Sequence, residues 1–378
     1  MPPPSPASIL AHFQELDDPR ISPATRHQLL DIVAIALCAV ICGADTWVEV
    51  EAFGRAKEAW LRTFLALPHG MPSHDTFGRV FAALDPEQFE RGFRSWVAAV
   101  VKLTAGAVVA VDGKTLRRSH DRSQGKEALV LVSAWAEANR LLLGQVAVPA
   151  GSNEIPVIPA VVQQLALEGC LVTVDAIGCQ SAIATQITEQ GADYVLALKE
   201  NQETLHDAVV FLFAAGQADG FAGLSHDYRR TIEKNHGRLE VRQVWTVAEP
   251  AVIAYLDPAG AWPQLRSVAM VVAERRIGAE SSRETRYYLS SLPGNAARVG
   301  AAVRGHWGIE NRLHWVLDIA FREDESRVRQ GHAGQNLAVL RRLALNLLRQ
   351  EPTAKMGTKA KRLKAGWDHP YLLKLLAG

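Results

Sequence analysis

The sequence predicts a mixed α/β fold preceded by an all-helical segment, because the spacing of its apolar residues changes along the chain. Through residue 104, apolar residues recur at helical intervals in four stretches, 29–40, 47–67, 76–84 and 89–103. From Ala105 onward, short β-branched apolar runs alternate with polar turns, which is typical of buried or half-buried strands. We therefore expect an all-α N-terminal domain over residues 1–104 and an α/β domain over residues 105–350.

The α/β domain is expected to begin with three consecutive strands that form a meander. Two crossovers of helix and parallel strand follow, which gives the order βββαβαβ. In the N-terminal domain, Ser73 is placed to cap the third helix. The elements expected in the α/β domain are strands at 107–112, 129–135 and 141–148, a helix at 155–167, a strand at 171–175, a helix at 179–189 and a strand at 194–199.

Composition indicates a globular chain with a sizeable core. The chain has 378 residues, of which 48% are hydrophobic and 21% charged. The longest apolar run, from Ile32 to Ala44, is too short to cross a bilayer, and the N-terminus lacks the pattern of a secretory signal. We therefore expect a soluble, cytoplasmic protein with no membrane partner. No CxxC pair occurs, which favours free thiols over a zinc site at the four cysteines, Cys38, Cys42, Cys170 and Cys179.

Charge is balanced overall but uneven along the chain. The net charge is only +1, yet the window from Arg341 to Lys364 holds eight basic residues against one acid. This window is a candidate stripe for binding backbone phosphates, and residues 351–378 are expected to form a basic C-terminal tail. A solvated basic segment without a partner is the alternative. The eight basic residues are Arg341, Arg342, Arg349, Lys355, Lys359, Lys361, Arg362 and Lys364.

Two acids end strands of the predicted sheet. Asp112 ends the first strand and Asp175 ends the fourth, and ligand sites in α/β sheets gather at the carboxyl ends of strands. Asp112 precedes Gly113, so an Asp-Gly turn is the alternative for that residue. A carboxylate that closes a buried strand is expensive to desolvate without a cation nearby. The pair therefore favours a Mg²⁺ site, because this ion is bound by a few carboxylates together with water and substrate phosphate.

A third acid is expected from a helix near the end of the α/β domain. Glu310 lies mid-helix, and the spacing places His306, Glu310 and His314 along one face. A solvated glutamate beside core histidines is the alternative. The three residues could also be ligands of a transition metal, although the HExxH order of zinc hydrolases is absent.

Several sequence blocks together resemble the DDE transposases of bacterial insertion sequences, in particular the ISAs-type group that includes the H-repeat-associated proteins of Rhs elements. The resemblance covers nearly the whole chain. The blocks lie at 16–20 (LDDPR), 36–45 (ALCAVICGAD), 72–80 (PSHDTFGRV), 111–115 (VDGKT), 174–180 (VDAIGCQ), 197–202 (ALKENQ), 236–238 (HGR) and 306–315 (HWGIENRLHW).

The resemblance implies a ribonuclease-H-like fold with catalytic acids at Asp112, Asp175 and Glu310. A mostly β insertion, from about Thr204 to Arg286, would interrupt this fold before the glutamate helix. The same acids would hold two Mg²⁺ ions, for which Mn²⁺ can substitute. Phosphoryl transfer with two ions would then cleave and join DNA strands, with Asp112 bridging both ions.

The sequence departs from the broader transposase group around the glutamate, where that group carries a Tyr-Arg-Glu-Lys signature. Val303, His306 and Leu317 occupy the positions of the tyrosine, arginine and lysine. Phosphate contacts are therefore expected from other basic residues, such as Arg304, Arg312 or Lys199.

Double-stranded DNA, both transposon ends and target, is the partner that the resemblance implies, with a homodimer in the DNA complex. Trp307, one helical turn before Glu310, is expected to stack on an unpaired base, whereas Trp315 is expected to anchor the helix in the core. Alternatives are a core position for Trp307 and a solvated surface for the basic residues. The full set of expected DNA contacts is Lys199, Asn201, His236, Arg238, Arg304, His306, Trp307, Arg312, Arg341 and Arg342.

Three functions are compatible with this sequence. An active transposase is the leading hypothesis. A catalytically degenerate, DNA-binding relative is disfavoured, because three converging carboxylates would repel phosphate without a metal. A hydrolytic nuclease of the same fold would use the same acids, so the sequence separates it poorly from a transposase.

Overall fold

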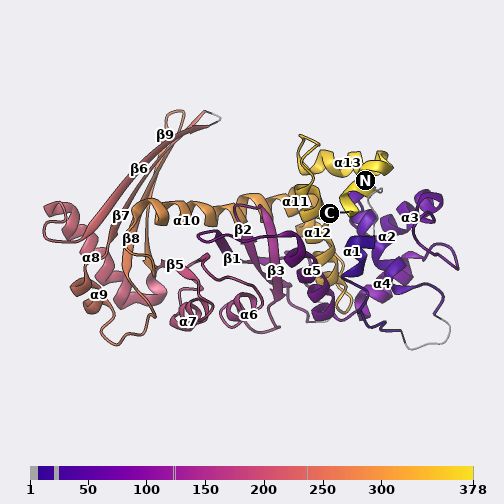
Figure 1. Cartoon of the computed structure of the whole chain (residues 1–378), viewed down its shortest axis with the longest axis horizontal. Helices are drawn as coiled ribbons and strands as arrows, with labels where there is room; N and C mark the ends of the chain where they lie inside the picture. The colour runs from indigo at the N-terminus through magenta and orange to yellow at the C-terminus, as the bar shows by residue number, and fades with distance from the viewer. Residues whose placement is uncertain (1–6, 21–24, 122, 124, 236, 378) are drawn as a thin grey trace.

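A single nine-stranded mixed sheet, covered by helices, forms the centre of the protein (Figure 1). The computed structural model describes residues 7–20, 25–121, 123, 125–235 and 237–377. The sheet combines parallel and antiparallel pairs, and its strands alternate with helices along the chain. The mixed α/β class predicted from the sequence is therefore confirmed.

The described residues before the sheet form helices only. Ser73 caps α4 as predicted, since its hydroxyl accepts from the backbone N–H of Thr76. Thr46 and Glu49 form a capping box at the start of α3. Gly43, with φ of 118°, ends α2 in the left-handed conformation that glycine adopts without strain. The five helices are α1 (Ala7–Ala11), α2 (Leu29–Cys42), α3 (Trp47–Leu61), α4 (His74–Ala83) and α5 (Pro86–Val100).

Helix α2 accounts for the longest apolar run, because it is buried along almost its entire length. Within the described part of the chain, no single helix has the length and hydropathy of a membrane span. The pair α2 and α3 meets these criteria only jointly and is bent by 98° between the two helices. All four cysteines are free thiols, as the absence of a CxxC pair predicted.

Strands β1 to β5 place the ends of β1 and β4 side by side. β1 pairs antiparallel with β2 and parallel with β4, and β4 pairs parallel with β5. Val111 of β1 lies opposite Val174 of β4, so Asp112 and Asp175 follow at neighbouring positions on the same edge. The elements in chain order are β1 (Val108–Thr115), β2 (Val130–Ala136), β3 (Leu141–Ala147), α6 (Ile158–Gln163), β4 (Leu171–Val174), α7 (Ser181–Glu189) and β5 (Asp193–Leu198).

Four long antiparallel strands extend the same sheet beyond β5. β9 pairs with β5, and the order continues as β9-β8-β7-β6. These strands project away from the rest of the molecule (Figure 1), and apolar side chains near their tips, such as Ile232 and Ile277, are exposed. The segment comprises a short 3-10 turn (Glu200–Gln202), α8 (Glu203–Asp219), β6 (His226–Asn235), β7 (Arg238–Val247), α9 (Pro250–Leu256), β8 (Ser267–Ile277) and β9 (Glu280–Ser290).

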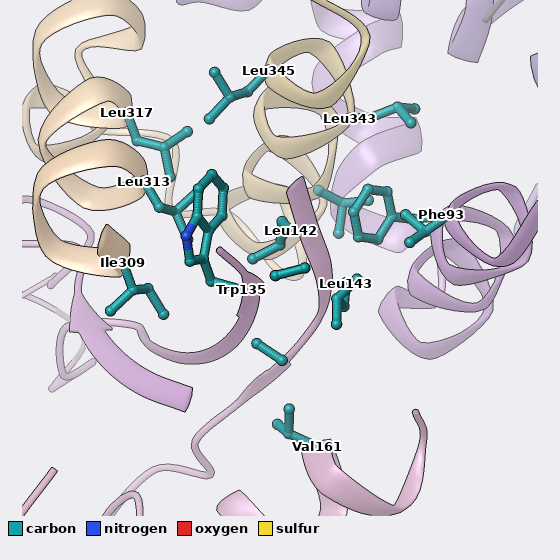
Figure 2. Close-up of a cluster of buried hydrophobic side chains, with 14 of the residues drawn as sticks. Phe93, Trp135, Leu142, Leu143, Val161, Ile309, Leu313, Leu317, Leu343 and Leu345 are labelled. Carbon is teal, nitrogen blue, oxygen red and sulfur yellow. The ribbon is translucent and has the colours of Figure 1, made fainter. Parts of the chain in front are cut away.

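A long, continuous helical segment then crosses the sheet (Figure 1). It consists of α10 (Ala296–Gly308), a π-helical turn (Ile309–His314) and α11 (Trp315–Phe321). Its apolar side anchors it, since Ile309, Leu313 and Leu317 are buried near Trp135 of β2 (Figure 2). This packing leaves the adjacent residue, Glu310, free to face the ends of β1 and β4.

The C-terminal helices pack against the N-terminal ones, so both ends of the chain lie in the same part of the molecule (Figure 1). After a 3-10 turn (Glu323–Glu325), the helices are α12 (Ala333–Gln350), α13 (Thr358–Trp367) and α14 (His369–Leu376).

This packing corrects the prediction of a basic tail and a phosphate-binding stripe. Residues 358–376 form packed helices instead of a solvated extension. Lys361 donates to the carbonyls of Leu348 and Glu351, and Arg362 donates to the carbonyl of Val40. The donors of Lys361 and Arg362 are therefore hydrogen-bonded within the protein. Four of the eight side chains are buried, Arg341, Arg342, Lys361 and Arg362.

Candidate active site

Asp112 lies at the edge of the sheet where its carboxylate meets other acids. Its side chain is mostly buried, and its Oδ1 accepts from the backbone N–H of Gly113. Burial, and after it the nearby charges of Asp175, Glu310 and Glu154, together raise the pKa of Asp112 to about 7. Asp175 follows the last residue of β4, on the neighbouring strand. The structure thus brings the three sequence-predicted acids within electrostatic reach of one another.

Glu310 belongs to the π-helical turn in the middle of the long helical segment. The backbone N–H of Trp315 donates to the carbonyl of Glu310, five residues earlier, instead of four as in an α-helix. Single π turns occur often at functional sites, because they turn side chains away from their α-helical directions. The turn keeps Ile309 and Leu313 buried while Glu310 is exposed toward the strand ends.

The two histidines of this helix face the same strands. His306 Nδ1 lies 3.0 Å from the hydroxyl of Thr173 on β4, and His314 Nδ1 lies 3.6 Å from Asp112 Oδ2. Burial lowers the pKa of both rings, that of His314 to about 3, so both are neutral at pH 7. Among the described residues, no three or more His, Cys, Asp or Glu side chains are grouped to hold a metal.

Glu154 is a fourth acid at this site, which sequence reasoning missed. Its carboxylate packs on the backbone of Gly113, where a Cβ would overlap it. Burial, together with the charge of Asp175, raises the pKa of Glu154. Glu154 lies in the loop after β3, and nothing in its local sequence distinguishes it from other loop acids. The close approach explains why the residue after Asp112 is glycine.

Lys114 is the second residue that sequence reasoning missed. Its Nζ lies 2.8 Å from Asp318 on α11 and 2.9 Å from Asp324 beyond it, and the side chain is 8% exposed. Alternation along β1 places Lys114 on the same face as Asp112, which was the available signal. The ion pairs fasten the strand that carries Asp112 to the helical segment that carries Glu310.

Comparison with known proteins identifies the family. The family model described as "Transposase DDE domain" matches residues 104–347, and the model described as "DDE_Tnp_1-associated" matches residues 10–97. The chain belongs to the DDE transposase family. The resemblance predicted from the sequence blocks is thereby confirmed.

Relatives of this transposase occur in Escherichia coli. The protein named "Putative transposase YncI" from strain O157:H7 is 37% identical over 373 residues, which covers 98% of this chain and 94% of the relative. The "H repeat-associated putative transposase YhhI" is 34% identical and covers 98% of both chains. A solved piggyBac transposase synaptic complex with hairpin DNA aligns with a TM-score of 0.39 at 10% identity, over 96% of this chain and 76% of that one. A TM-score this low does not establish that the two proteins share a fold.

Three of the expected DNA contacts lie beside the acids of the transposase. Lys199, His306 and Trp307 line a cavity of about 280 Å³, together with Asp175 and Glu310. Lys199 is exposed, whereas His306 is bound to β4 as described above. Trp307 is 39% exposed, and the guanidinium carbon of Arg286 lies 4.6 Å from the centre of its ring.

Asn201 has a structural partner. Its Nδ2 donates to the carbonyl of Ala176, 2.7 Å away, and so ties the end of β5 to the turn after Asp175.

The remaining exposed arginines of the prediction lie along a larger groove between α10 and the projecting strands. The groove has a volume of about 920 Å³, and each of the three arginines has a carboxylate partner. Arg238 pairs with Glu240 at 2.7 Å, Arg304 pairs with Glu233, and Arg312 pairs with Glu137. DNA would have to compete with these acids. His236 lies outside the described residues.

Two predicted DNA contacts are wrong in this structure. Arg341 and Arg342 are 2% and 0% exposed, because α12 is enclosed by helices of both halves of the chain. Arg342 is neutralised by Glu323 at 2.5 Å, so it cannot reach a phosphate. The expectation that Trp315 is a core anchor is also wrong, since it is 59% exposed. The π turn lets Leu313 and Leu317 anchor the helix instead.

Proposed function

We propose that this transposase cleaves DNA strands and joins them to new positions, with Asp112, Asp175 and Glu310 as its catalytic residues. The observation that carries the proposal is the meeting of these acids: Asp112 and Asp175 follow paired residues of β1 and β4, and Asp175 and Glu310 line the same cavity. Strands β1 to β5, in the order β3-β2-β1-β4-β5, and the glutamate helix would together be the ribonuclease-H-like unit of the chain.

Divalent metal fits the donor set of this site. Carboxylates are the protein ligands that Mg²⁺ prefers, and acids that raise the pKa of a neighbour are relieved by a cation. Asp112, Asp175 and Glu310 would hold the ions, and Mn²⁺ would substitute for Mg²⁺. Because the described residues contain no group already arranged as a metal site, the side chains would have to move together around an ion. When bound, two ions would activate the attacking oxygen and stabilise the leaving oxygen of the phosphodiester.

Other side chains of the site have positioning roles in this proposal. Neutral His314 directs Nδ1 toward Asp112, and Lys114 holds β1 against the helical segment. Lys199 would contact a strand phosphate in the cavity beside Asp175, while the partly exposed ring of Trp307 would stack on an unpaired base.

Double-stranded DNA is the proposed partner, as transposon end and as target. Two copies of the chain would act together in the DNA complex, because an element has two ends to process. This substrate would place the protein in the cytoplasm.

Removing the acids one at a time tests the proposal. Asp112→Asn, Asp175→Asn and Glu310→Gln should each abolish cleavage of a duplex carrying the end of the parent element, while DNA binding stays near that of the wild type. The effects should not add, because each change disables the same site. Glu189→Gln is the matched control, since Glu189 is an exposed acid on α7. If a variant of one of the three acids still cleaves at a tenth of the wild-type rate, the acid it replaces is not a catalytic residue.

Joining distinguishes a transposase from a nuclease of the same fold. A donor duplex with a free 3′-hydroxyl, supplied with Mg²⁺ and target DNA, should yield joined product. Cleavage without joining would identify a hydrolytic nuclease. A degenerate relative would do neither; one shorter match, the "Inactive transposase YbfQ", is 35% identical over only 72 residues of this chain. Retention of all three acids argues against degeneracy here.

A further inference from the structure

A second large cavity lies away from the acids, between the N-terminal helices and the loop that follows α11. Its volume is about 670 Å³. The walls come from the start of α3, from α4, from the segment after β1 and from the loop 322–330, while α12 contributes Arg341. We call it the arginine cavity, after the five arginines that line it, Arg79, Arg118, Arg322, Arg327 and Arg341.

Arg341 is the buried member of this set. The side chain is almost fully enclosed, and its Nη2 has no hydrogen-bond partner. The adjacent Arg342 pairs with Glu323, although its Nε is likewise buried without a hydrogen-bond partner. A buried guanidinium with an unused donor is costly unless an anion or another acceptor reaches it. Arg341 lies enclosed beneath the cavity, where the nearby charges of Glu323 and Asp45 favour its charged form, so contacts to an anion would come from the exposed arginines of the cavity.

Four further arginines line the cavity from exposed positions, and one of them, Arg322, is paired with Glu325. Among the described residues, Arg79, Arg118 and Arg327 form no ion pair; Arg79 only donates from Nε to the carbonyl of Asp75, at 3.3 Å. In the groove beside α10, in contrast, Arg238, Arg304 and Arg312 each have a carboxylate partner. A guanidinium group that forms no ion pair can donate two hydrogen bonds to a phosphate.

The acids of the cavity do not cancel this charge, because most of them have other partners. Glu49 accepts from two backbone N–H groups at the start of α3, and Glu325 pairs with Arg322. Asp45 lies 3.6 Å from the guanidinium of Arg362. The acids that line the cavity are Asp45, Glu49, Asp75 and Glu325.

The arginine cavity is connected to the candidate active site through β1 and the loop after α11. Lys114, between Asp112 and Arg118 in the chain, is paired with Asp324 of that loop. Arg117 pairs with the same aspartate, at 3.2 Å. These ion pairs join the strand that carries Asp112 to the loop that lines the cavity.

We propose that the arginine cavity binds backbone phosphates of the DNA, outside the segment that is cleaved, and thereby holds the duplex against the N-terminal helices. This inference rests on the proposed function, and it gives the N-terminal domain a role in binding DNA. A small phosphate compound would form the same hydrogen bonds with the arginines. The experiment must therefore distinguish phosphates of DNA from a free phosphate compound.

The test measures DNA binding against salt concentration, in EDTA so that no cleavage occurs. Arg79→Ala, Arg118→Ala and Arg327→Ala are made singly and together, because these side chains are exposed and their removal should leave the fold intact. Each lost phosphate contact should flatten the slope of log K against log salt by about 0.9, and the triple variant by roughly three times that amount. Arg91→Ala is the control, since Arg91 is an exposed arginine of α5 that does not line the cavity.

The outcomes separate this inference from the proposed function. A flatter slope in the triple variant, with the control unchanged and both melting temperatures near that of the wild type, supports the DNA site. If the wild type binds DNA and the triple variant keeps its slope, the inference is overturned and the proposed function stands. If the wild type binds no DNA at all, both are overturned. If pyrophosphate raises the melting temperature of the wild type but not of the triple variant, while the DNA slope is unchanged, the cavity is a small-anion site and the DNA assignment is overturned.

Discussion

Asp112→Asn should stabilise the metal-free protein, although it destroys the proposed catalysis. Asp112 is buried beside three other acids, so its negative charge is unfavourable in the folded state. Asparagine keeps the shape and the Oδ1 acceptor for the N–H of Gly113 while it removes the charge. Catalytic groups often reduce stability in this way, because their arrangement serves a ligand that is absent from the free protein.

The raised pKa sets the size and the pH dependence of the effect. In the folded protein the pKa of Asp112 is about 7, against an ordinary value of 3.8. Between these values the folded state retains a proton that the unfolded chain has released, so the contribution of Asp112 to stability falls as pH rises from about 4 to 7. The full difference corresponds to about 4 kcal/mol above pH 7, and to about 2 kcal/mol at pH 5. His314 stays neutral throughout this range, so it does not offset the charge.

Chemical denaturation in EDTA at pH 5 and pH 8 measures this effect. The gap between the variant and the wild type should widen as the pH rises, with the variant more stable at pH 8. Glu189→Gln serves as the control, because the acid it replaces is exposed and distant from the site. Mg²⁺ should stabilise the wild type and leave the variant unchanged. A variant that is less stable than the wild type at pH 8, or a gap independent of pH, would refute this account of the acid cluster.

Three other substitutions follow from particular contacts. Gly113→Ala should lower cleavage at least tenfold, since the new methyl group displaces the Glu154 carboxylate, and a melting curve within a few degrees of the wild type would locate the defect in the site. Arg342→Met should cost about 3–5 kcal/mol in unfolding experiments, because it leaves Glu323 buried and unpaired, and adding Glu323→Gln should recover part of that loss. Trp307→Ala should cost about 1–2 kcal/mol, less than a core tryptophan, yet slow second-strand processing more than first-strand nicking in a cleavage time course; a parallel loss of both steps would contradict a role in stacking on DNA.

Local patterns in the sequence were sufficient for the class of fold and for the candidate acids. Alternating and β-branched runs predict strands from a few neighbouring residues, so Asp112 and Asp175 could be placed at strand ends before any pairing was known. The parallel register of β1 with β4 then brought them to the same edge. The motif around Glu310 likewise pointed to a helix, although the π turn at that residue has no signature in the local spacing.

Only the tertiary structure determines which charged side chains are buried. A charge count predicts a basic surface at Arg341 and Arg342, yet these residues interrupt an apolar run of α12 that helices of both halves enclose. A charge count does not record what packs on a helix, whereas the apolar residues on both sides of the arginines were the better signal. Glu154 is the opposite case, an acid of the site that the sequence did not predict. Its local sequence is that of an ordinary loop, and only the path of the chain after β3 carries its carboxylate to Gly113, because contacts between distant segments depend on the whole fold.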